Sequence, residues 1–545
     1  MKANILFEKN RSFFPNDISA LYEYQTKAIE KIMQNKNTLS IVPTGGGKSL
    51  IYQLSGMELD GITLVISPLL ALMKEQVDQL NLRGANVISI TSNMGFSTQR
   101  DVLRNLNKIK PRLIYVSPER LQDYFFKYAL INSNLPISLI AIDEAHCISQ
   151  WGIEFRPEYA QIKSFVNFLR KYGQNPILFA LTATLSLKAR KDIVEEFEIE
   201  KDNIIIDKNI IRNELNLEFR KVKKEDEKVN ATIEFLNKYN CKKTIVYLYD
   251  RKKCEELSSL FNNLGYSTSF FHADMDYNSK SESYELFLEG KYTILFATTA
   301  FGMGMNIPDI DSVIHYHIPN SVEEYYQQVG RAARKKNICP KANCLVLWSD
   351  ENIKVRKRRI AKGAYNIEKL ILAVRSFGLE NKKGKICSIS YTYYKDSELN
   401  LPLLRFLFEK YGLFEVVGDL NGSPGTIKFK STTPFWLKVM KYSDDIVDSF
   451  KIASEDGNIP FLDILDFIHK EDLQNNIEFM PAKDKNLYYF SNINRIPTRT
   501  LEKIKLDFDK VVKFKIDQFE KFVGLLEIKS KRERISHIKN ILGVT

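Results

Sequence analysis

Short apolar runs alternate with longer amphipathic stretches over the first two thirds of the chain. The first series of apolar runs comprises TLSIV, ITLVI, NVISI, RLIYV, LIAI and ILFAL, and polar or glycine residues follow soon after each. Near-continuous apolar strands separated by helical patterns are typical of a doubly wound parallel sheet. The pattern therefore predicts an α/β domain from about residue 21 to about residue 206.

The same alternation resumes after a charged segment at residues 220–230. A second series of apolar runs comprises TIVYLYDR, STSFFHADM, YTILFATTAFGMGMNIPDI and SVIHYHIP, and it ends near Trp348. We therefore predict two tandem parallel-sheet α/β domains, the first at residues 1–206 and the second at residues 207–350.

The last third of the chain follows a different pattern. Residues 401–432 read as an amphipathic helix followed by two strands around a glycine-rich turn, which predicts a winged-helix-like domain. A generic α+β packing domain is the alternative. We assign a linker and this domain to residues 351–440, and a mostly helical C-terminal region to residues 441–545.

Composition narrows the class of protein. A chain of 545 residues is longer than one hydrophobic core usually supports, and its net charge of +12 favours a polyanionic partner. No apolar run is long enough to cross a membrane, and the six cysteines form no C-x-x-C pair. We therefore expect a soluble, cytoplasmic protein with reduced thiols, no membrane association and no structural zinc.

A phosphate-binding motif, PTGGGKS, follows the first apolar run. Its three glycines allow backbone N–H groups to turn around phosphate oxygens, Lys48 reaches the β- and γ-phosphates, and Ser49 opens a helix with its hydroxyl on Mg²⁺. Val42 stands where the strict pattern has a further glycine. Strand, glycine turn, Lys-Ser pair and helix nevertheless follow in order, so we predict a site for ATP and Mg²⁺.

An acidic pair follows the apolar run LIAI, in the stretch DEAHCISQWGIEFRPEY. Acidic residues after such a strand emerge at the carboxyl edge of the sheet, where open α/β sheets bind ligands. Asp143 is therefore a candidate Mg²⁺ ligand, and Glu144 a candidate for orienting an attacking water. A solvated loop is the plainer interpretation of such a pair taken alone.

The same stretch continues with an unusual group of aromatic residues. Trp151, Phe155, Arg156 and Tyr159 have the composition of a surface that stacks bases and contacts backbone phosphates. Burial in a core is the alternative for the aromatic side chains.

The second domain supplies polar and cationic candidates. Thr298 and Gly304 lie in a flexible loop after an apolar run, which suits close approach to a phosphate chain. SVEEYYQQVGRAARKK then contains Gln327, Arg331 and Arg334. Arginines three residues apart share a helix face, and arginine stabilises the charge on a transferring phosphoryl group. A charged, solvated helix is the alternative.

Taken in order, these stretches resemble the motifs of the RecQ family of DNA helicases, in the second helicase superfamily. The matching segments are VPTGGGKSLIYQL, SPLLALMKEQV, VSPERL, DEAHCISQWGIEFRPEY, LTAT, ATTAFGMGMNIP and YYQQVGRAAR. CISQWGIEFRPEY is similar to the aromatic-rich loop that distinguishes RecQ proteins from other DEAH-bearing helicases. The resemblance covers residues 18–350 and implies two tandem RecA-like domains with ATP-driven, 3′-to-5′ unwinding of DNA.

The resemblance also implies roles for individual residues. The nucleotide-binding set is Gln25, Thr44, Gly45, Gly46, Gly47, Lys48 and Ser49, with Ser49 and Asp143 as metal ligands. The catalytic set is Lys48, Asp143, Glu144, Gln327, Arg331 and Arg334, in which the two arginines form the arginine finger. The coupling and DNA-binding set is Ser67, His146, Gln150, Trp151, Phe155, Arg156, Thr182, Thr184, Thr298 and Gly304.

The chain also departs from the family pattern. RNEL at residues 212–215 only partly matches an R-P-N-[LI] motif, and Ala333 replaces the usual glycine of the arginine motif. Lys335 and Lys336 replace an acidic residue and a glycine, and the four-cysteine zinc module of the family is absent. Both arginines remain in place, so we expect hydrolysis to persist with an altered rate.

The leading functional hypothesis is an ATP-dependent DNA helicase or translocase that acts on single-stranded and tailed duplex DNA in repair, recombination or defence. The alternative is an ATP-gated DNA-binding subunit that loads or regulates a partner such as a nuclease, with little unwinding of its own. The C-terminal region is the expected site for a protein partner. An RNA helicase is a third option, and the RecQ-type loop argues against it.

Overall fold

The computed structural model describes most of the two predicted domains and parts of the last third. The described residues are 2–16, 18–43, 45–91, 94–148, 157–183, 186–207, 212–302, 307–334, 337–362, 368–372, 374, 386–390, 401–421, 426–430, 446–448, 470–472, 474–480, 485–490 and 496–543.

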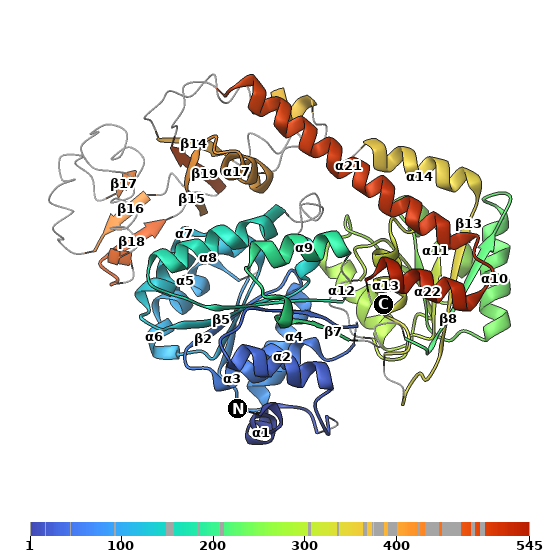
Figure 1. The fold of residues 1–545 in the computed structure, drawn as a ribbon, viewed down its shortest axis with the longest axis horizontal. Helices are drawn as coiled ribbons and strands as arrows, with labels where there is room; N and C mark the ends of the chain where they lie inside the picture. The colour runs from blue at the N-terminus through green and yellow to red at the C-terminus, as the bar shows by residue number, and fades with distance from the viewer. Residues whose placement is uncertain are drawn as a thin grey trace.

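The first domain is a seven-stranded parallel sheet in the order β3-β4-β2-β5-β6-β1-β7. Its strands are β1 (Thr38–Ile41), β2 (Ile62–Ile66), β3 (Val87–Ile90), β4 (Leu113–Val116), β5 (Ile137–Ile142), β6 (Ile177–Thr182) and β7 (Ile204–Ile206). The central strands are buried, apart from Ser138 in β5, because helices cover both faces, as Figure 1 shows. The predicted strands of this domain are confirmed.

Helices and short 3-10 turns connect these strands. The helices are α1 (Ala3–Lys9), α2 (Glu23–Met33), α3 (Lys48–Glu58), α4 (Leu70–Leu82), α5 (Phe96–Arg104), α6 (Leu106–Ile109), α7 (Tyr124–Asn132), α8 (Ile162–Lys171) and α9 (Leu187–Glu196). The 3-10 turns are η1 (Arg11–Phe13), η2 (Pro118–Gln122), η3 (Ala145–Ile148), η4 (Pro157–Gln161) and η5 (Lys201–Asn203).

The second domain is a six-stranded parallel sheet in the order β10-β11-β9-β12-β13-β8. Its strands are β8 (Leu215–Lys221), β9 (Thr244–Tyr247), β10 (Thr268–Phe271), β11 (Ile294–Ala297), β12 (Ser312–His315) and β13 (Ala342–Trp348). Its helices are α10 (Glu227–Tyr239), α11 (Arg251–Asn263), α12 (Tyr277–Leu288) and α13 (Val322–Val329). Two tandem parallel-sheet domains are therefore confirmed.

The last third contains two small antiparallel sheets, in the orders β14-β19-β15 and β17-β16-β18, together with helices. The strands are β14 (Ile386–Ser390), β15 (Glu415–Asn421), β16 (Thr426–Phe429), β17 (Ile446–Asp448), β18 (Ile477–Met480) and β19 (Lys485–Phe490). The helices are α14 (Asp350–Lys362), α17 (Leu401–Lys410), α21 (Thr498–Leu526) and α22 (Lys531–Ile541).

The predicted winged-helix hairpin is wrong. Helix α17 and strands β15 and β16 are present, but the two strands belong to different sheets and do not pair with each other. Strand β15 pairs with β19, and β16 pairs with β17 and β18. These partners are far away in the sequence, so the local pattern could not reveal them. Strands also replace part of the helical region predicted from residue 441, whereas its final helices are confirmed.

The C-terminal helices bind the last third to the second domain. Helix α21 runs as one long rod from the small sheets toward α13 and α14 (Figure 1). Near the end of α21, Phe522 is fully buried. The centre of its ring lies 6.4 Å from the ring centre of Phe219 and 5.4 Å from that of Tyr325. Within the described residues no helix has the length and apolar character needed to cross a bilayer.

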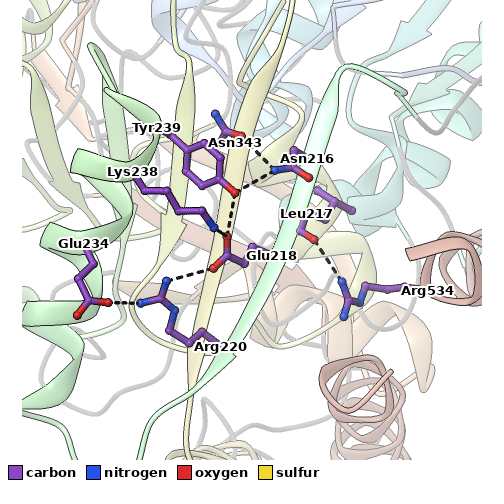
Figure 2. Close-up of polar contacts among 9 residues, drawn as sticks. All are labelled: Asn216, Leu217, Glu218, Arg220, Glu234, Lys238, Tyr239, Asn343 and Arg534. Atoms are coloured by element: carbon purple, nitrogen blue, oxygen red, sulfur yellow. Dashed lines mark hydrogen bonds and ion pairs between the residues drawn. The ribbon is translucent and has the colours of Figure 1, made fainter. Parts of the chain in front are cut away.

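Helix α22 covers the outer edge of the second sheet, where β8 has a strand partner on one side only among the described residues. Arg534 donates to the carbonyl of Leu217 at 3.2 Å (Figure 2). Its guanidinium lies 4.3 Å from the ring centre of Phe219. An uncovered edge strand offers unpaired backbone groups to other chains, so this contact protects the sheet from edge-to-edge pairing.

We expect Phe522→Ala to destabilise the contact between α21 and the second domain by about 3–5 kcal/mol, because it empties a buried aromatic site. Denaturant unfolding followed by tryptophan fluorescence measures the change. Leu506→Ala is the matched control, since Leu506 lies in the same helix with 54% of its surface exposed, and its effect should stay within about 0.5 kcal/mol. Equal effects of the two substitutions would contradict the docking of α21 through Phe522.

Candidate functional site

The glycine turn after β1 has a backbone that depends on glycine. Gly45 and Gly47 have φ angles of +78° and +67°, in the region that favours glycine, and Gly47 caps helix α3. A Cβ atom on Gly46 would lie 2.8 Å from the Tyr24 hydroxyl and 3.0 Å from the Pro43 carbonyl oxygen. The turn places Lys48 and Ser49 at the N-terminus of α3, an arrangement that binds phosphate through backbone N–H groups.

Helix α2 braces this turn from the side. The Tyr24 hydroxyl donates to the Gly46 carbonyl at 2.5 Å, and the Gln25 side-chain amide donates to the Gly47 carbonyl at 2.9 Å. The Gln25 carbonyl oxygen accepts from the backbone N–H of Tyr22 at 2.8 Å. Gln25 therefore lies at the predicted site, but an adenine would have to replace these partners, and its adenine contact stays a prediction.

The acidic pair lies at the carboxyl end of β5. The Asp143 carboxylate accepts from the backbone N–H of Glu144 at 3.0 Å and from the Ser67 hydroxyl at 3.4 Å. Glu144 has a φ of +49°, a conformation that costs energy in a residue with a side chain. Lys48 Nζ lies 3.6 Å from Glu144 Oε1, so the phosphate motif and the acidic pair meet in one site.

Because these side chains are buried, the charge on each one affects the pKa of its neighbours. Burial and the neighbouring Glu144 carboxylate raise the pKa of Asp143 to about 6. Lys48 and His146 hold the pKa of Glu144 below its usual range, against the effect of burial. A buried carboxylate whose ionised form is disfavoured gains from a nearby cation. Asp143 therefore suits Mg²⁺, which prefers oxygen ligands, and the role of the Ser49 hydroxyl as a second ligand stays a prediction.

Strand β6 lies between β1 and β5 and connects their functional ends. His146 Nδ1 lies 3.3 Å from Glu144 Oε2 and 3.1 Å from the Thr182 hydroxyl oxygen at the end of β6. The Thr182 carbonyl accepts from the backbone N–H of Val42, just before the glycine turn. His146 and Thr182 thus connect the acidic pair with the phosphate motif, as a coupling role requires.

The second domain brings both predicted arginines to the same place. A Cβ atom on Gly45 would lie 3.7 Å from Arg334 Cγ, so Arg334 lies against the glycine turn of the first domain. Arg331 is 4% exposed, and its charge contributes to the lowered pKa of Glu144. Burial, together with the neighbouring Arg331, lowers the pKa of Arg334 to about 9. A buried and a partly buried guanidinium group next to each other favour an anion such as a triphosphate.

The other predicted residues of the second domain lie nearby with less specific contacts. The Thr298 hydroxyl accepts from the backbone N–H of Ala300 at 3.4 Å, in the loop after β11. Gln327 is partly buried in α13, whereas its neighbour Gln328 bonds His315 at 2.7 Å. The functional roles of Thr298 and Gln327 stay predictions.

Several predicted residues lie outside the described part of the chain. They are Thr44, Gln150, Trp151, Phe155, Arg156, Thr184 and Gly304. Their roles stay predictions. Tyr159, which the sequence placed on the same stacking surface, is fully buried and donates through its hydroxyl to the Asp143 carbonyl at 2.8 Å. The prediction of an exposed Tyr159 is therefore wrong, because its ring belongs to the core of the first domain.

Sequence reasoning did not predict three further contacts of this site. Tyr24 contacts the glycine turn, Gly302 packs against the Arg331 guanidinium, and Arg212 binds the backbone around the arginines. A Cβ atom on Gly302 would lie 2.9 Å from Arg331 Nη2, so a larger residue in that position would collide with the Arg331 side chain. The weak motif at residues 212–215 was the available signal for Arg212.

Comparison with known proteins agrees with this geometry. The DEAD/DEAH box helicase family matches residues 22–193, and the helicase conserved C-terminal domain matches residues 227–336. The chain is 35% identical over 313 residues to the ATP-dependent DNA helicase RecQ of Pasteurella multocida, covering 57% of this chain and 48% of that protein. The chain spans about half the length of this relative and of the RecQ helicase of Bacillus subtilis.

A second relative matches over most of its length. The probable ATP-dependent DNA helicase RecS of Bacillus subtilis is 32% identical over 393 residues, covering 72% of this chain and 73% of that protein. Among solved structures, the DUF1998 helicase MrfA bound to DNA superposes with a TM-score of 0.52 at 16% identity, over 75% of this chain and 57% of that chain. That likeness concerns the fold alone.

We expect Gly46→Ala to weaken nucleotide binding at least about tenfold, or 1.4 kcal/mol, because the added Cβ atom meets the Tyr24 hydroxyl and the Pro43 carbonyl. Titration with a fluorescent ATP analogue measures the affinity. Gly524→Ala is the control, since no atom lies within 4 Å of its added Cβ atom in α21. Unchanged affinity in Gly46→Ala would show that the glycine turn does not hold the nucleotide.

Proposed function

The chain belongs to the RecQ family of DNA helicases, and from this membership we propose that it couples ATP hydrolysis to 3′-to-5′ movement along DNA and to duplex unwinding. The observation that carries the proposal is the division of one buried site between two domains. Lys48 and Glu144 come from the first domain, and Arg334 of the second lies against the glycine turn of the first.

The residues suit phosphoryl transfer to water. Backbone N–H groups of the glycine turn and Lys48 hold the phosphates, and Asp143 with Ser49 would hold Mg²⁺. When bound, the metal ion neutralises charge on the phosphate oxygens. Glu144, kept ionised by Lys48 and His146, orients the attacking water. Arg331 and Arg334 stabilise the charge that develops on the transferred group.

Division of the site between domains makes hydrolysis sensitive to their relative position. An arginine misplaced by 1 Å can lower a rate about a hundredfold, so opening and closing of the domains would switch turnover. DNA is the partner we propose, because the relatives are DNA helicases and the chain carries a net charge of +12.

Tyr159 offers a route by which DNA would affect hydrolysis. The predicted DNA-contacting residues, including Trp151 and Arg156, lie between the acidic pair and η4 in the sequence. The Tyr159 hydroxyl fixes η4 to the Asp143 carbonyl. Both ends of the predicted DNA loop are therefore attached to the hydrolytic site, so contact with DNA would reposition Asp143 and Glu144.

An ATP-gated subunit that regulates a partner is the second candidate, because the last third differs from the predicted winged-helix arrangement. Assays of strand separation and of ATP hydrolysis on the same preparation distinguish the two candidates. Strand separation on a 3′-tailed duplex supports the helicase, whereas ATP hydrolysis stimulated by single-stranded DNA without strand separation supports the subunit. Stimulation by RNA in place of DNA would contradict both.

We expect Lys48→Ala to lower ATP turnover at least about a hundredfold, because it removes the cation that contacts the phosphates and Glu144. Phosphate release in the presence of single-stranded DNA measures the rate. The control is Lys27→Ala, which removes an exposed lysine of α2 that pairs with Glu23. Near-native turnover in Lys48→Ala would refute the assigned site.

We expect the double substitution of Trp151 and Arg156 by alanine to remove stimulation of ATP hydrolysis by DNA while basal turnover stays within about twofold, because base stacking and phosphate contact are lost. Turnover with and without single-stranded DNA measures the ratio. A variant that DNA stimulates as strongly as the native protein would exclude this loop as the DNA sensor.

A further inference from the structure

Arg212 binds the backbone of the segment that carries the two predicted arginine-finger residues. One terminal nitrogen of its guanidinium donates to the carbonyls of Gly330 at 3.1 Å and Ala332 at 2.8 Å. The other terminal nitrogen donates to the carbonyl of Ala333. These three carbonyls surround Arg331 and directly precede Arg334, so a single side chain fixes the backbone on which both stand.

The bonds from Arg212 cover the end of a helix and the residues that follow it. Helix α13 ends at Val329, so the Gly330 carbonyl belongs to its C-cap and has no partner within the helix, whereas Ala332 and Ala333 lie beyond the helix. A guanidinium at this end also interacts favourably with the helix dipole. The backbone N–H of Arg212 donates to the Tyr326 hydroxyl at 2.6 Å, so backbone and side chain both attach residue 212 to the end of α13.

The held segment contains a strained residue. Ala333 has a φ of +50°, in the left-handed region that residues other than glycine rarely adopt. Such a conformation persists only where the surrounding contacts fix it. Arg212 binds the carbonyl of Ala333, and the backbone N–H of Ala333 donates to the Ile310 carbonyl at 2.9 Å. With an alanine at this position, the path of the chain into Arg334 depends on those contacts.

The contacts of the Arg212 guanidinium distinguish its role from that of Arg331 and Arg334. Arg212, Arg331 and Arg334 lie close together, and Arg212 contributes to the lowered pKa of Arg334. Glu214 Oε2 lies 3.9 Å from Arg212 Nε. Because the terminal nitrogens of Arg212 are engaged with carbonyls, it is suited to act through the finger segment rather than on a phosphate.

The position of Arg212 in the chain gives these contacts a further consequence. Strand β7 ends the first sheet at Ile206, and β8 begins the second sheet at Leu215. Arg212 therefore stands in the connection between the domains, three residues before β8. A shift of this connection when the domains move would act directly on the backbone of the arginine segment.

We propose that Arg212 is a positioning residue that aligns Arg331 and Arg334 with the nucleotide and ties their alignment to the connection between the domains. This inference rests on the proposed function, since it assigns a role within ATP hydrolysis. Arg212 would affect the transition state of hydrolysis and leave binding of the ground-state nucleotide unchanged.

The test compares Arg212→Gln and Arg212→Lys in the full chain. We expect Arg212→Gln to lower kcat for ATP about a hundredfold with an unchanged KM, because the finger loses its alignment. Arg212→Lys retains the charge but cannot reach three carbonyls at once, so its kcat should fall about tenfold. Affinity for ADP with aluminium fluoride, which mimics the transition state, should fall in parallel, while affinity for a non-hydrolysable ATP analogue stays the same.

Arg220→Gln is the matched control from the neighbouring strand. Arg220 lies on β8 and pairs with Glu218 at 3.2 Å and Glu234 at 2.8 Å, away from the finger (Figure 2). It should retain native kcat. Thermal unfolding and circular dichroism establish whether each variant is folded at the assay temperature. If Arg212→Gln is not folded, the kinetic test uses Arg212→Lys.

The outcomes separate the two proposals. A fall in kcat and in transition-state-analogue affinity at constant KM supports the positioning role. Native kcat in a folded Arg212 variant overturns that role while leaving the proposed function intact, and so does an equal loss of affinity for ground-state and transition-state analogues. An absence of ATP turnover by the native chain overturns the proposed function and the inference together.

Discussion

The buried contact between Lys48 and Glu144 determines how the rest of the site is arranged. It joins the phosphate motif after β1 to the acidic pair after β5, across 3.6 Å, with both side chains largely shielded from solvent. A buried carboxylate is costly without a cation, so Glu144 stays ionised only because Lys48 and His146 lie beside it. Asp143 has a raised pKa, because burial disfavours its charged form and its neighbour Glu144 is another carboxylate.

The two domains therefore present opposite charges to one another. Asp143 and Glu144 give the first domain a surplus of buried negative charge beside Lys48, and Arg331 and Arg334 give the facing segment a surplus of positive charge. A magnesium triphosphate complements both, because its metal ion suits the carboxylates and its phosphates suit the lysine and the arginines. This complementarity explains why neither domain alone would form a complete hydrolytic site.

The sequence predicted the parts of this arrangement that depend on local pattern. Apolar runs revealed most strands of the two large sheets, although β7, β8 and β13 were not among the predicted runs. Asp143 and Glu144 directly follow one of those strands and Lys48 follows the turn after another, because parallel strands bring their carboxyl ends to one edge. The two arginines stood out by their spacing, and their role as an arginine finger followed from family resemblance. The closeness of Arg334 to the glycine turn became visible only in the structure.

Contacts between distant segments account for the failures. Strands β15 and β16 were predicted to pair because a turn separates them, but each pairs with strands that come later in the chain. Tyr159 looked like part of a stacking surface, and it is buried because its hydroxyl reaches back to Asp143. Arg212 was noted as half of a weak motif, and its role depends on carbonyls more than a hundred residues later.

The last third of the chain is attached to both domains next to the hydrolytic site. Helix α17 packs against η4, where Ala160 contributes to the distal core and Tyr159 bonds the Asp143 carbonyl. Helix α21 begins in the same distal core and continues to Phe522, whose ring meets Tyr325 of α13. Helix α13 leads directly into Arg331. In the proposed function, closure of the two domains switches hydrolysis. Because α21 is a long helix that contacts both the distal core and α13, the distal third is placed to restrain such a closure.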